Sequence, residues 1–339
     1  MYTFLMLDNV RKSCQETFGR SLVLTGRPSA SHHDFAILRH DSLYTQSGVL
    51  IENSTYCAGE NVEGAFNYHV YAPRMIAPDV ATEEGPSDCF WLGYFHDHFG
   101  HFLTSTLQRL WHLPAHKRHY AGYIAPHCGG RDDENGFIAG IFDSLKIERR
   151  AILQVPENTI LRSIVIAEPA FVENSHCYRI WGSFMRDLGR SILGTRRKPP
   201  EKRPIFLSRS QTRSATRCYE GEETLSQLLS NFGIETCHPE SLSLKEQLTL
   251  WDSHSVFIGF SGSAFMNAAF FDNKTIIILN HDGYIFGTQR MIDAIAHNKA
   301  LYLEVDLFLA KECSVSHRYR ITEPEALTAE IIRAVRCLA

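Results

Sequence analysis

Hydrophobic and polar residues alternate over short runs in roughly the first 90 residues of the chain. The runs at 47–52 and 67–71 are examples, and glycine, proline, asparagine and serine separate them. Alternation with a period of two, bounded by turn residues, is typical of β-strands that bury one face. The pattern predicts strands and turns for this part of the chain.

The pattern becomes helical at Phe99. From there to Trp111, apolar or small side chains recur every three or four positions and form one face of a helix. Pro114 is expected to end this helix, because proline has no amide hydrogen to donate. The next elements that the pattern predicts are strands at 122–125 and 162–167 and helices at about 136–145 and 177–193.

Strands and helices alternate regularly after residue 203. Strands are expected at 204–208, 233–237, 255–260 and 275–280, and helices at 221–232, 243–253, 263–271 and 323–338. This alternation is typical of right-handed βαβ units that build a parallel sheet. The sequence therefore predicts a Rossmann-like domain over residues 204–310, followed by a closing segment, 311–339, that contains the last helix.

A basic, proline-rich segment precedes this second half. Residues 194–204 read GTRRKPPEKRP, with no periodicity and no apolar side chain. Such a composition is typical of a linker, which we place at 196–203, after an N-terminal domain at 1–195. Two interpretations of its charge stay open: a solvated tether, or a surface that binds anionic lipid or substrate.

Composition and charge narrow the class of protein. The chain has 339 residues, of which 44% are hydrophobic and 21% charged, as expected for a globular protein of two domains. Its formal net charge of -4 gives no reason to expect nucleic-acid binding. Its nine cysteines contain no C-x-x-C pair, which argues against a zinc ribbon or a disulfide framework and favours a reducing cytosol.

Two further absences concern targeting and membranes. No segment approaches the roughly 18 consecutive apolar residues that a membrane-spanning helix needs. The apolar run near the N-terminus is too short for a signal peptide, and no basic residue precedes it. We therefore expect a cytoplasmic protein.

Candidate chemistry in the second half gathers where strands end. Ligands of doubly wound sheets bind at the carboxyl ends of the strands. Arg209 follows the strand at 204–208 and has a fork of donors that suits phosphate. After the strand at 255–260, Gly262 allows close approach of the backbone, and a helix beginning at Ser263 offers amides and a positive dipole end. These features predict a phosphate site. Gln247, in the helix that precedes this strand, is a further candidate for binding a ligand there.

The same glycine turn permits a second interpretation. Residues 259–263 read GFSGS, close to the G-x-S-x-G turn that presents the nucleophile of many serine hydrolases. Ser261 would be the nucleophile, and its acid and histidine partners would have to follow it in the chain. Only 78 residues follow Ser261 (339 − 261), which is short for the remaining strands and both partners. Candidate partners are Asp272, His281, Asp282 and His297.

Titratable residues cluster once in the first half. Residues 91–101 read WLGYFHDHFGH and contain Asp97, His98 and His101. A metal site is one interpretation, but neither H-E-x-x-H nor another standard ligand spacing is present. A general base is a plainer interpretation, because an imidazole, or a carboxylate paired with one, accepts a proton near neutral pH. A structural interpretation also stays open, in which one or more of these residues cap the helix or pack at its start.

Four segments in this order together resemble glycosyltransferase family 61, in particular its bacterial members of capsular or surface polysaccharide synthesis. The first begins HFGHFL and includes Leu107, Arg109, Leu110 and Trp111. The others are Leu207–Arg209 with Glu220, the segment 239–247 (PESLSLKEQ) and the segment 259–270 (GFSGSAFMNAAF).

This resemblance implies a fold and an activity. The fold would be GT-B-like, with two Rossmann-like domains facing each other across a cleft and the donor mainly on the C-terminal one. The activity would be inverting sugar transfer from a nucleotide-sugar, with a UDP-sugar expected, to a glycan or lipid-linked glycan at the cytoplasmic membrane face. No metal ion or other cofactor is expected.

The resemblance also implies roles for individual residues. Arg209 and the turn formed by Gly262, Ser263 and Ala264 would compensate the charge of the diphosphate leaving group. Glu220 would bind the ribose hydroxyls. Gln247 and Asn267 would line the donor site.

Two positions depart from the family pattern. Ser105 stands where relatives tend to carry an acidic residue, and Ser261 where they carry histidine. A serine hydroxyl is a poor proton acceptor at neutral pH. Either Asp97, His98 or His101 is the base, or the chain is a catalytically weak member that binds a nucleotide-sugar or glycan.

Overall fold

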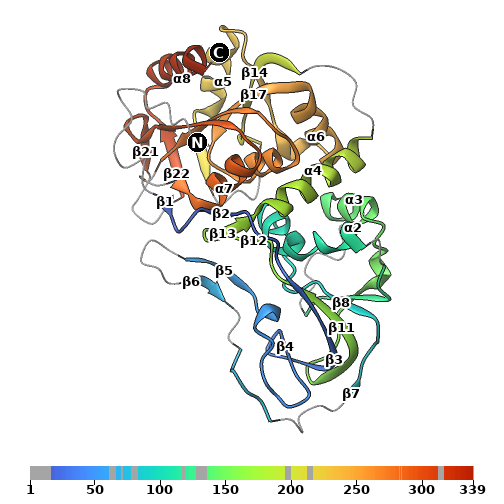
Figure 1. The fold of residues 1–339 in the computed structure, drawn as a ribbon. Helices are drawn as coiled ribbons and strands as arrows, with labels where there is room; N and C mark the ends of the chain where they lie inside the picture. Colours follow the sequence, from blue (N-terminus) through green and yellow to red (C-terminus); the bar gives the residue numbers. More distant parts are fainter. Residues whose placement is uncertain are drawn as a thin grey trace. The chain divides into compact units, whose positions relative to one another are not determined.

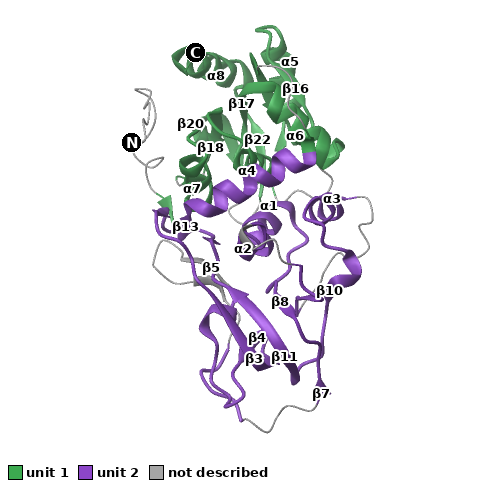
Figure 2. Cartoon of the chain, turned by 45° about the vertical axis from the view of Figure 1, so that its right-hand side comes forward, with its two compact units in different colours: residues 1–18, 193–339 green, residues 19–192 purple. Residues whose placement is uncertain are grey.

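A computed structural model of the protein describes residues 17–60, 66–69, 72–77, 83–116, 119–126, 136–194, 200–211, 217–281, 283, 285–311 and 317–338. The chain forms two compact units, coloured separately in Figure 2. Unit 1 consists of residues 1–18 and 193–339, and unit 2 of residues 19–192.

Unit 1 is built around a five-stranded parallel sheet with the order β16-β14-β17-β18-β20. In chain order this is 2-1-3-4-5, one of the two common orders of doubly wound folds. Strands β14 and β17 of this sheet are labelled in Figure 1. The parallel sheet that the sequence predicts for the second half is confirmed. Its strands are β14 (Glu201–Leu207), β16 (Glu235–Cys237), β17 (His254–Phe260), β18 (Thr275–Asn280) and β20 (Lys299–Glu304).

Helices cover this sheet in two groups. Helices α5 (Glu222–Ser230) and α8 (Pro324–Leu338) pack against each other, and α6 (Leu244–Ser253) and α7 (Gly287–Ile295) both pack against η8 (Ser263–Phe270). A core of buried aliphatic and aromatic side chains joins the first group to the sheet. This core includes Phe206, Leu225, Leu229, Ile258, Ile277, Leu327 and Ile331.

Helix α6 carries the capping box that the sequence predicts. Ser243 Oγ accepts a hydrogen bond from the Glu246 amide at 3.4 Å, and Glu246 Oε2 accepts one from the Ser243 amide at 2.8 Å. At the other end, Lys274 Nζ donates to the carbonyl of His254 at 2.6 Å and also to that of Trp251. These bonds satisfy backbone groups that have no partner within the helix, so both ends of α6 are fixed.

The helix expected at 263–271 is the tighter 3₁₀ form, η8. Asn267 Nδ2 donates to the Ala264 carbonyl at 3.2 Å. In an α-helix that carbonyl would accept from the amide of residue 268. The side chain competes for it, as short polar side chains do.

Smaller pairings complete unit 1. Strand β15 (Cys218–Glu220) pairs with β22 (Arg318–Ile321), which also pairs with β21 (Leu309–Lys311) after the short η9 (Asp306–Phe308). Strand β1 (Thr17–Phe18) pairs in parallel with β19 (Ile285–Phe286).

Unit 2 contains a mixed sheet with the order β10-β9-β8-β11-β3-β4, and β7 also pairs with β11. All pairings among strands β7 to β11 are parallel. Strand β3 is antiparallel to β11, and β4 is antiparallel to β3. The strands are β3 (Ala30–Arg39), β4 (Ser42–Tyr44), β7 (Glu83–Glu84), β8 (Cys89–Trp91), β9 (Gly122–Ile124), β10 (Ile152–Leu153) and β11 (Thr159–Ala167).

The remaining elements of unit 2 are short apart from two helices. The predicted helices at 136–145 and 177–193 are α3 (Phe137–Ser144) and α4 (Arg179–Leu193). Strands β2 (Leu22–Leu24), β13 (His176–Tyr178) and β12 (Phe171–Val172) form a three-stranded sheet, and β5 (Cys57–Glu60) pairs with β6 (Phe66–His69). Single 3₁₀ turns lie at η2 (Glu52–Ser54) and η6 (Arg149–Ala151) in unit 2 and at η7 (Pro239–Ser241) in unit 1.

The strand expected at 47–52 is wrong. Val49 and Leu50 form only isolated bridges, to Met75 and Tyr44 respectively. Gly48 has a φ of 81°, which belongs to a turn, and η2 begins at Glu52. Pairing beyond single bridges is therefore interrupted on both sides.

The single helix expected at 99–113 is broken into four pieces. They are α1 (Phe99–His101), a π-helical turn η4 (Phe102–Thr106), a 3₁₀ turn η5 (Leu107–Arg109) and α2 (His112–His116). Pro114 lies inside α2 rather than after the helix, near the start where the missing amide hydrogen costs little. The buried Arg109 guanidinium donates to the carbonyls of Ala167 at 2.5 Å and Thr55 at 3.2 Å. Tertiary contacts thus override the regular helical period, and π-turns are frequent at functional sites.

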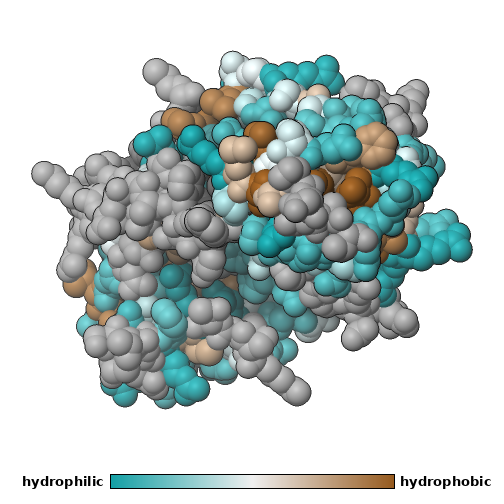
Figure 3. All heavy atoms as spheres, turned by 90° about the horizontal axis from the view of Figure 1, so that it is seen from below, coloured by the Kyte–Doolittle hydropathy of each residue, from teal (hydrophilic) through white to brown (hydrophobic). Residues whose placement is uncertain are grey.

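In the view of Figure 3, hydrophilic residues dominate the coloured part, and hydrophobic ones form separate patches. The large hydrophobic side chains that are exposed are Leu22, Phe35, Val49, Met75, Phe232 and Leu307. In the part of the chain that the structure describes, no helix is both long and apolar enough to cross a membrane.

Two sequence expectations fall partly on undescribed residues. Of the expected linker at 196–203, residues 196–199 lie outside the described ranges, and β14 already begins at Glu201. Cys14, Cys128 and Cys313 also lie outside them. Among the described cysteines, the free thiols are Cys89, Cys177, Cys218, Cys237 and Cys337.

Candidate active site

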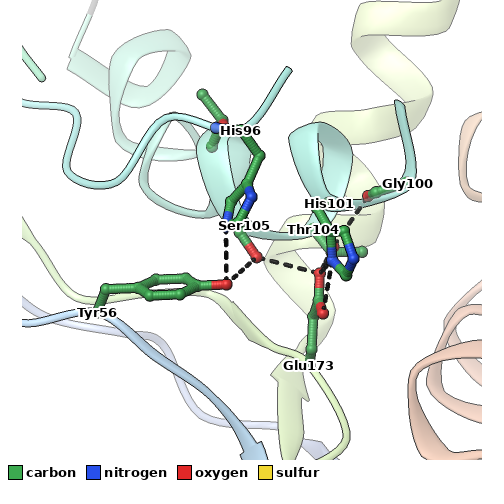
Figure 4. Close-up of polar contacts among 8 residues, drawn as sticks. Tyr56, His96, Gly100, His101, Thr104, Ser105 and Glu173 are labelled. Carbon is green, nitrogen blue, oxygen red and sulfur yellow. Dashed lines mark hydrogen bonds and ion pairs between the residues drawn. The ribbon is translucent and has the colours of Figure 1, made fainter. Parts of the chain in front are cut away.

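The π-turn of unit 2 and the residue that precedes it, His101, place three side chains around the carboxylate of Glu173 (Figure 4). His101 Nδ1 lies 2.8 Å from Glu173 Oε1 and 3.0 Å from Oε2. Ser105 Oγ donates to Oε1 at 3.1 Å, and Thr104 Oγ1 donates to the same oxygen. Glu173 follows β12, which packs against the π-turn. A carboxylate from one segment is thus held by a histidine and two hydroxyls from another.

Burial and the neighbouring polar groups shift the pKa of Glu173 in opposite directions. Its side chain is only 9% exposed, and burial alone raises the pKa of a carboxyl group. The hydrogen bond and charge of His101, with the hydroxyls of Thr104 and Ser105, outweigh burial and hold the pKa of Glu173 below its ordinary value of 4.5. In return, the hydrogen bond to Glu173 raises the pKa of His101 above 6.5, against the effect of burial.

A second set of hydrogen bonds extends this cluster. Tyr56 OH lies 3.2 Å from Ser105 Oγ and 3.0 Å from His96 Nε2, and the His96 amide donates to Thr106 Oγ1 at 2.8 Å. Burial, followed by the charge of His101, lowers the pKa of His96 to about 4. His96 is therefore neutral at physiological pH, and a continuous hydrogen-bonded chain connects it to His101.

The His101–Glu173 pair can act as a general base. The His101 side chain is 48% exposed, whereas that of Glu173 is buried. A carboxylate that accepts from Nδ1–H fixes the imidazole in the tautomer whose Nε2 carries the lone pair. The buried charge also stabilises the imidazolium that forms when Nε2 takes a proton.

The other candidates from the histidine segment lie outside this arrangement. Asp97 is exposed, and the residues hydrogen-bonded to the Glu173 carboxylate are His101, Thr104 and Ser105 instead. His98 precedes α1 as its N-cap residue, and its ring centre lies 5.4 Å from that of His101. Within the described ranges, no three histidine, cysteine, aspartate or glutamate side chains are arranged to hold a metal ion.

Sequence reasoning missed Glu173 and Tyr56. Glu173 is 72 positions from His101 in the chain, and Tyr56 is 49 positions from Ser105. No local spacing connects residues that far apart. The one available signal was the unexplained Ser105, which pointed to an acid supplied from elsewhere.

Unit 1 brings Arg209 and the glycine turn together. Arg209 follows β14 and the turn follows β17, and these strands are parallel neighbours with Leu207 opposite Gly259. Arg209 Nη1 donates to the Ser261 carbonyl at 3.1 Å. A Cβ atom on Gly262 would lie 2.5 Å from the same nitrogen. The guanidinium therefore lies directly over Gly262, at the carboxyl ends of two strands.

The other expected donor residues surround this turn. Ser263 and Ala264 are partly exposed at the start of η8, where the first amides of a helix have no intrahelical acceptor. Gln247 Nε2 donates to the carbonyls of Pro239 at 2.9 Å and Leu242 at 3.2 Å. Gln247 Oε1 accepts from Asn267 Nδ2 at 2.9 Å, so these two amides connect α6 to η8.

Glu220 and Glu222 occupy different environments. Glu220 is exposed at the end of β15. Glu222, which the sequence analysis did not single out, is fully buried, and its Oε1 accepts from the Arg209 amide at 3.0 Å. The acidic residue in contact with Arg209 is therefore Glu222.

The serine hydrolase interpretation finds no partner for Ser261 in the described structure. No described histidine or carboxylate is hydrogen-bonded to Ser261 Oγ, and His281 Nε2 is paired with Tyr219 OH at 2.7 Å. Asp282, another candidate partner, lies outside the described residues. It is the backbone carbonyl of Ser261, and not its hydroxyl, that accepts a hydrogen bond from Arg209 Nη1.

Comparison with known protein families agrees with the resemblance drawn from the four segments. The family model Glycosyltransferase 61 matches residues 99–278, just over half of the chain. The matched range begins at α1 and ends within β18, so it includes both the π-turn and the Arg209 turn. A search of curated proteins gives no match. The chain belongs to glycosyltransferase family 61 and is a glycosyltransferase.

Proposed function

We propose that the protein is an inverting, metal-independent glycosyltransferase that uses a nucleotide-sugar, with a UDP-sugar as the expected donor. The acceptor is a glycan or lipid-linked glycan in surface polysaccharide synthesis, at the cytoplasmic face of the membrane. The two units correspond to the two domains of a GT-B enzyme, with the donor on unit 1. The pairing of His101 with buried Glu173 is the observation that supports this function most, because transfer requires a proton acceptor.

The reaction follows from this assignment. The acceptor hydroxyl gives its proton to His101 Nε2 as its oxygen attacks the anomeric carbon from the side opposite the nucleotide. The bond between that carbon and the diphosphate oxygen breaks, and the nucleoside diphosphate leaves with the bonding electrons. One displacement inverts the anomeric configuration. Glu173 stabilises the imidazolium that is produced.

The Arg209 turn is proposed to bind the diphosphate. Arg209 supplies a forked cation, and the amides of Ser263 and Ala264 supply donors at the start of η8. Gly262 leaves room for the guanidinium and for close approach of phosphate. Gln247 and Asn267 support the turn from α6, and Glu220 is the candidate for the ribose.

Glu173 supports catalysis rather than binding alone. Ser105 occupies the position where relatives tend to carry an acid, which favours the alternative of a catalytically weak, nucleotide-sugar-binding member. The Glu173 carboxylate lies 3.1 Å from Ser105 Oγ and supplies a negative charge there. The alternative predicts nucleotide binding without turnover.

Arg209→Ala is expected to weaken donor binding by about 1.5–3 kcal/mol, the usual effect of losing a charge-assisted hydrogen bond. This corresponds to a roughly 10- to 150-fold higher Kd. Isothermal titration calorimetry with UDP and a panel of UDP-sugars measures it. Arg203→Ala is the matched control, because Arg203 is exposed on β14, the strand that precedes Arg209, and pairs with Glu235. An unchanged Kd in Arg209→Ala would remove the donor-site assignment.

Gly262→Ala should weaken the same binding by about tenfold, because the new Cβ would displace the Arg209 guanidinium. The φ of Gly262 is 172°, so alanine adopts this backbone without strain. In a double-mutant cycle, the two losses should not add, since both act through one guanidinium. Additive losses would show that the glycine acts independently of Arg209.

A further inference from the structure

Glu222 is a buried carboxyl group built into the base of the proposed diphosphate site. It is the first residue of α5 and has no exposed surface. Its Oε1 accepts from the Arg209 amide at 3.0 Å, while Oε2 has no hydrogen-bond partner among the described residues. The carboxyl therefore fixes the backbone of the residue that would contact phosphate.

The groups that face Glu222 come from three elements. Arg209 follows β14, Tyr219 belongs to β15, and Glu223 is its neighbour on α5. Burial raises the pKa of Glu222 to about 7, against the opposing effects of the Arg209 amide, the Arg209 guanidinium and the Ser208 hydroxyl, while the charge of Glu223 raises it further. Near neutral pH, both protonation states of this carboxyl are populated.

An anion at Arg209 changes this balance. A negative charge near a carboxyl group favours its protonated form. A phosphate would also engage the guanidinium, whose charge partly stabilises the Glu222 carboxylate. Both effects act in the same direction, towards uptake of a proton.

We propose that Glu222 is a positioning residue for Arg209 and that binding of an anionic diphosphate at Arg209 is coupled to uptake of one proton by the Glu222 carboxyl group. The inference rests on the proposed donor site. It predicts that donor affinity decreases as pH rises through neutrality, because the carboxylate form must first be protonated. The same coupling favours release of the nucleoside diphosphate at higher pH.

Calorimetry on wild-type protein, Glu222→Gln and Glu223→Gln tests this coupling. UDP-glucose is the first probe, because its diphosphate is esterified at both ends and its two remaining acidic groups stay ionised throughout this pH range. We expect wild-type affinity to fall about fivefold between about pH 6 and about pH 8, the effect of raising one pKa by about one unit from neutrality. Glu223→Gln should keep this dependence. Glu222→Gln should lose it, because its amide oxygen still accepts from the Arg209 amide but does not titrate.

Proton uptake by the wild-type protein provides a measurement that does not depend on any variant folding. Titrations near pH 7 in buffers of different ionisation enthalpy should show a fraction of a proton taken up per UDP-glucose bound. Binding without uptake, or with equal pH dependence in Glu222→Gln, would overturn the inference while leaving the donor site intact. No binding of UDP-glucose or UDP at either pH would instead contradict the donor site itself.

Discussion

Replacing His101 by asparagine is expected to lower kcat for sugar transfer by about 10²- to 10⁴-fold, the usual contribution of a positioned general base. Donor affinity should stay within about twofold of wild type, because we place the diphosphate at Arg209 in unit 1. Asparagine has no group that accepts a proton near neutral pH. Initial-rate kinetics with saturating donor and a glycan acceptor measure the loss.

His98→Asn is the informative comparison for this experiment. The two rings are neighbours, with centres 5.4 Å apart, but it is His101 that lies within hydrogen-bonding distance of the Glu173 carboxylate. We expect His98→Asn to reduce kcat much less than His101→Asn. The reverse order would show that the base is His98 and that the buried pair has a structural role.

Replacing Glu173 should affect both the pH dependence of catalysis and the stability of the fold. Activity requires neutral His101, so the wild-type rate falls as pH decreases through the raised pKa of His101. In Glu173→Gln the charge that raises this pKa is gone, and the acidic limb of the kcat profile should move to lower pH. The maximal rate should also fall, by up to about 10⁴-fold if the wrong imidazole tautomer dominates.

The stability effect has a defined pH window. The pKa of Glu173 is lowered on folding, so its contribution is present above 4.5 and is lost as pH falls through the folded value. The pKa of His101 is raised, so its contribution is present below 6.5 and is lost as pH rises through the folded value. The pair therefore stabilises the protein most between these two values. Glu173→Ala removes the acceptor of His101, Thr104 and Ser105, and because His101 is half exposed the loss should be about 1–3 kcal/mol.

Glu168→Gln is the matched control for the Glu173 variants. Glu168 lies in the same unit, accepts hydrogen bonds from the Ser29 amide and Tyr178 OH, and also has a lowered pKa. Thermal unfolding should show some loss of stability in this variant. Its kcat profile should keep the wild-type acidic limb, because Glu168 has no hydrogen bond to His101. A shift of the limb in both variants would indicate a general electrostatic effect.

The sequence predicted the parallel sheet of unit 1 well because strand and helix periods there depend on local patterns. The capping box at Ser243 and Glu246 is local too, and the structure confirms it. The form of the segment from Phe99 to Trp111 could not be predicted in this way. Its sequence has a regular helical period, but the contacts of buried Arg109 and of Glu173 break the helix into short turns. Long-range contacts decided its form.

The candidate site divides in the same way. Arg209 and Gly262 could be associated from sequence, because parallel strands bring their carboxyl ends to one edge. Glu173, Tyr56 and Glu222 could not, since their roles arise from burial and from partners distant in the chain or on another element. The sequence pointed to Glu220 as the acidic residue of the donor site, but the carboxylate that contacts Arg209 in the structure is that of Glu222.

Release of UDP from a panel of UDP-sugars, in the presence of glycan acceptors and with wild type compared with His101→Asn, measures whether His101 is the base of a sugar transfer. We expect turnover of at least one donor by wild-type protein. We also expect a loss of at least about 100-fold in His101→Asn, with UDP binding unchanged. Binding of UDP without turnover of any donor by wild type, or equal turnover by both proteins, would contradict a catalytic role of His101.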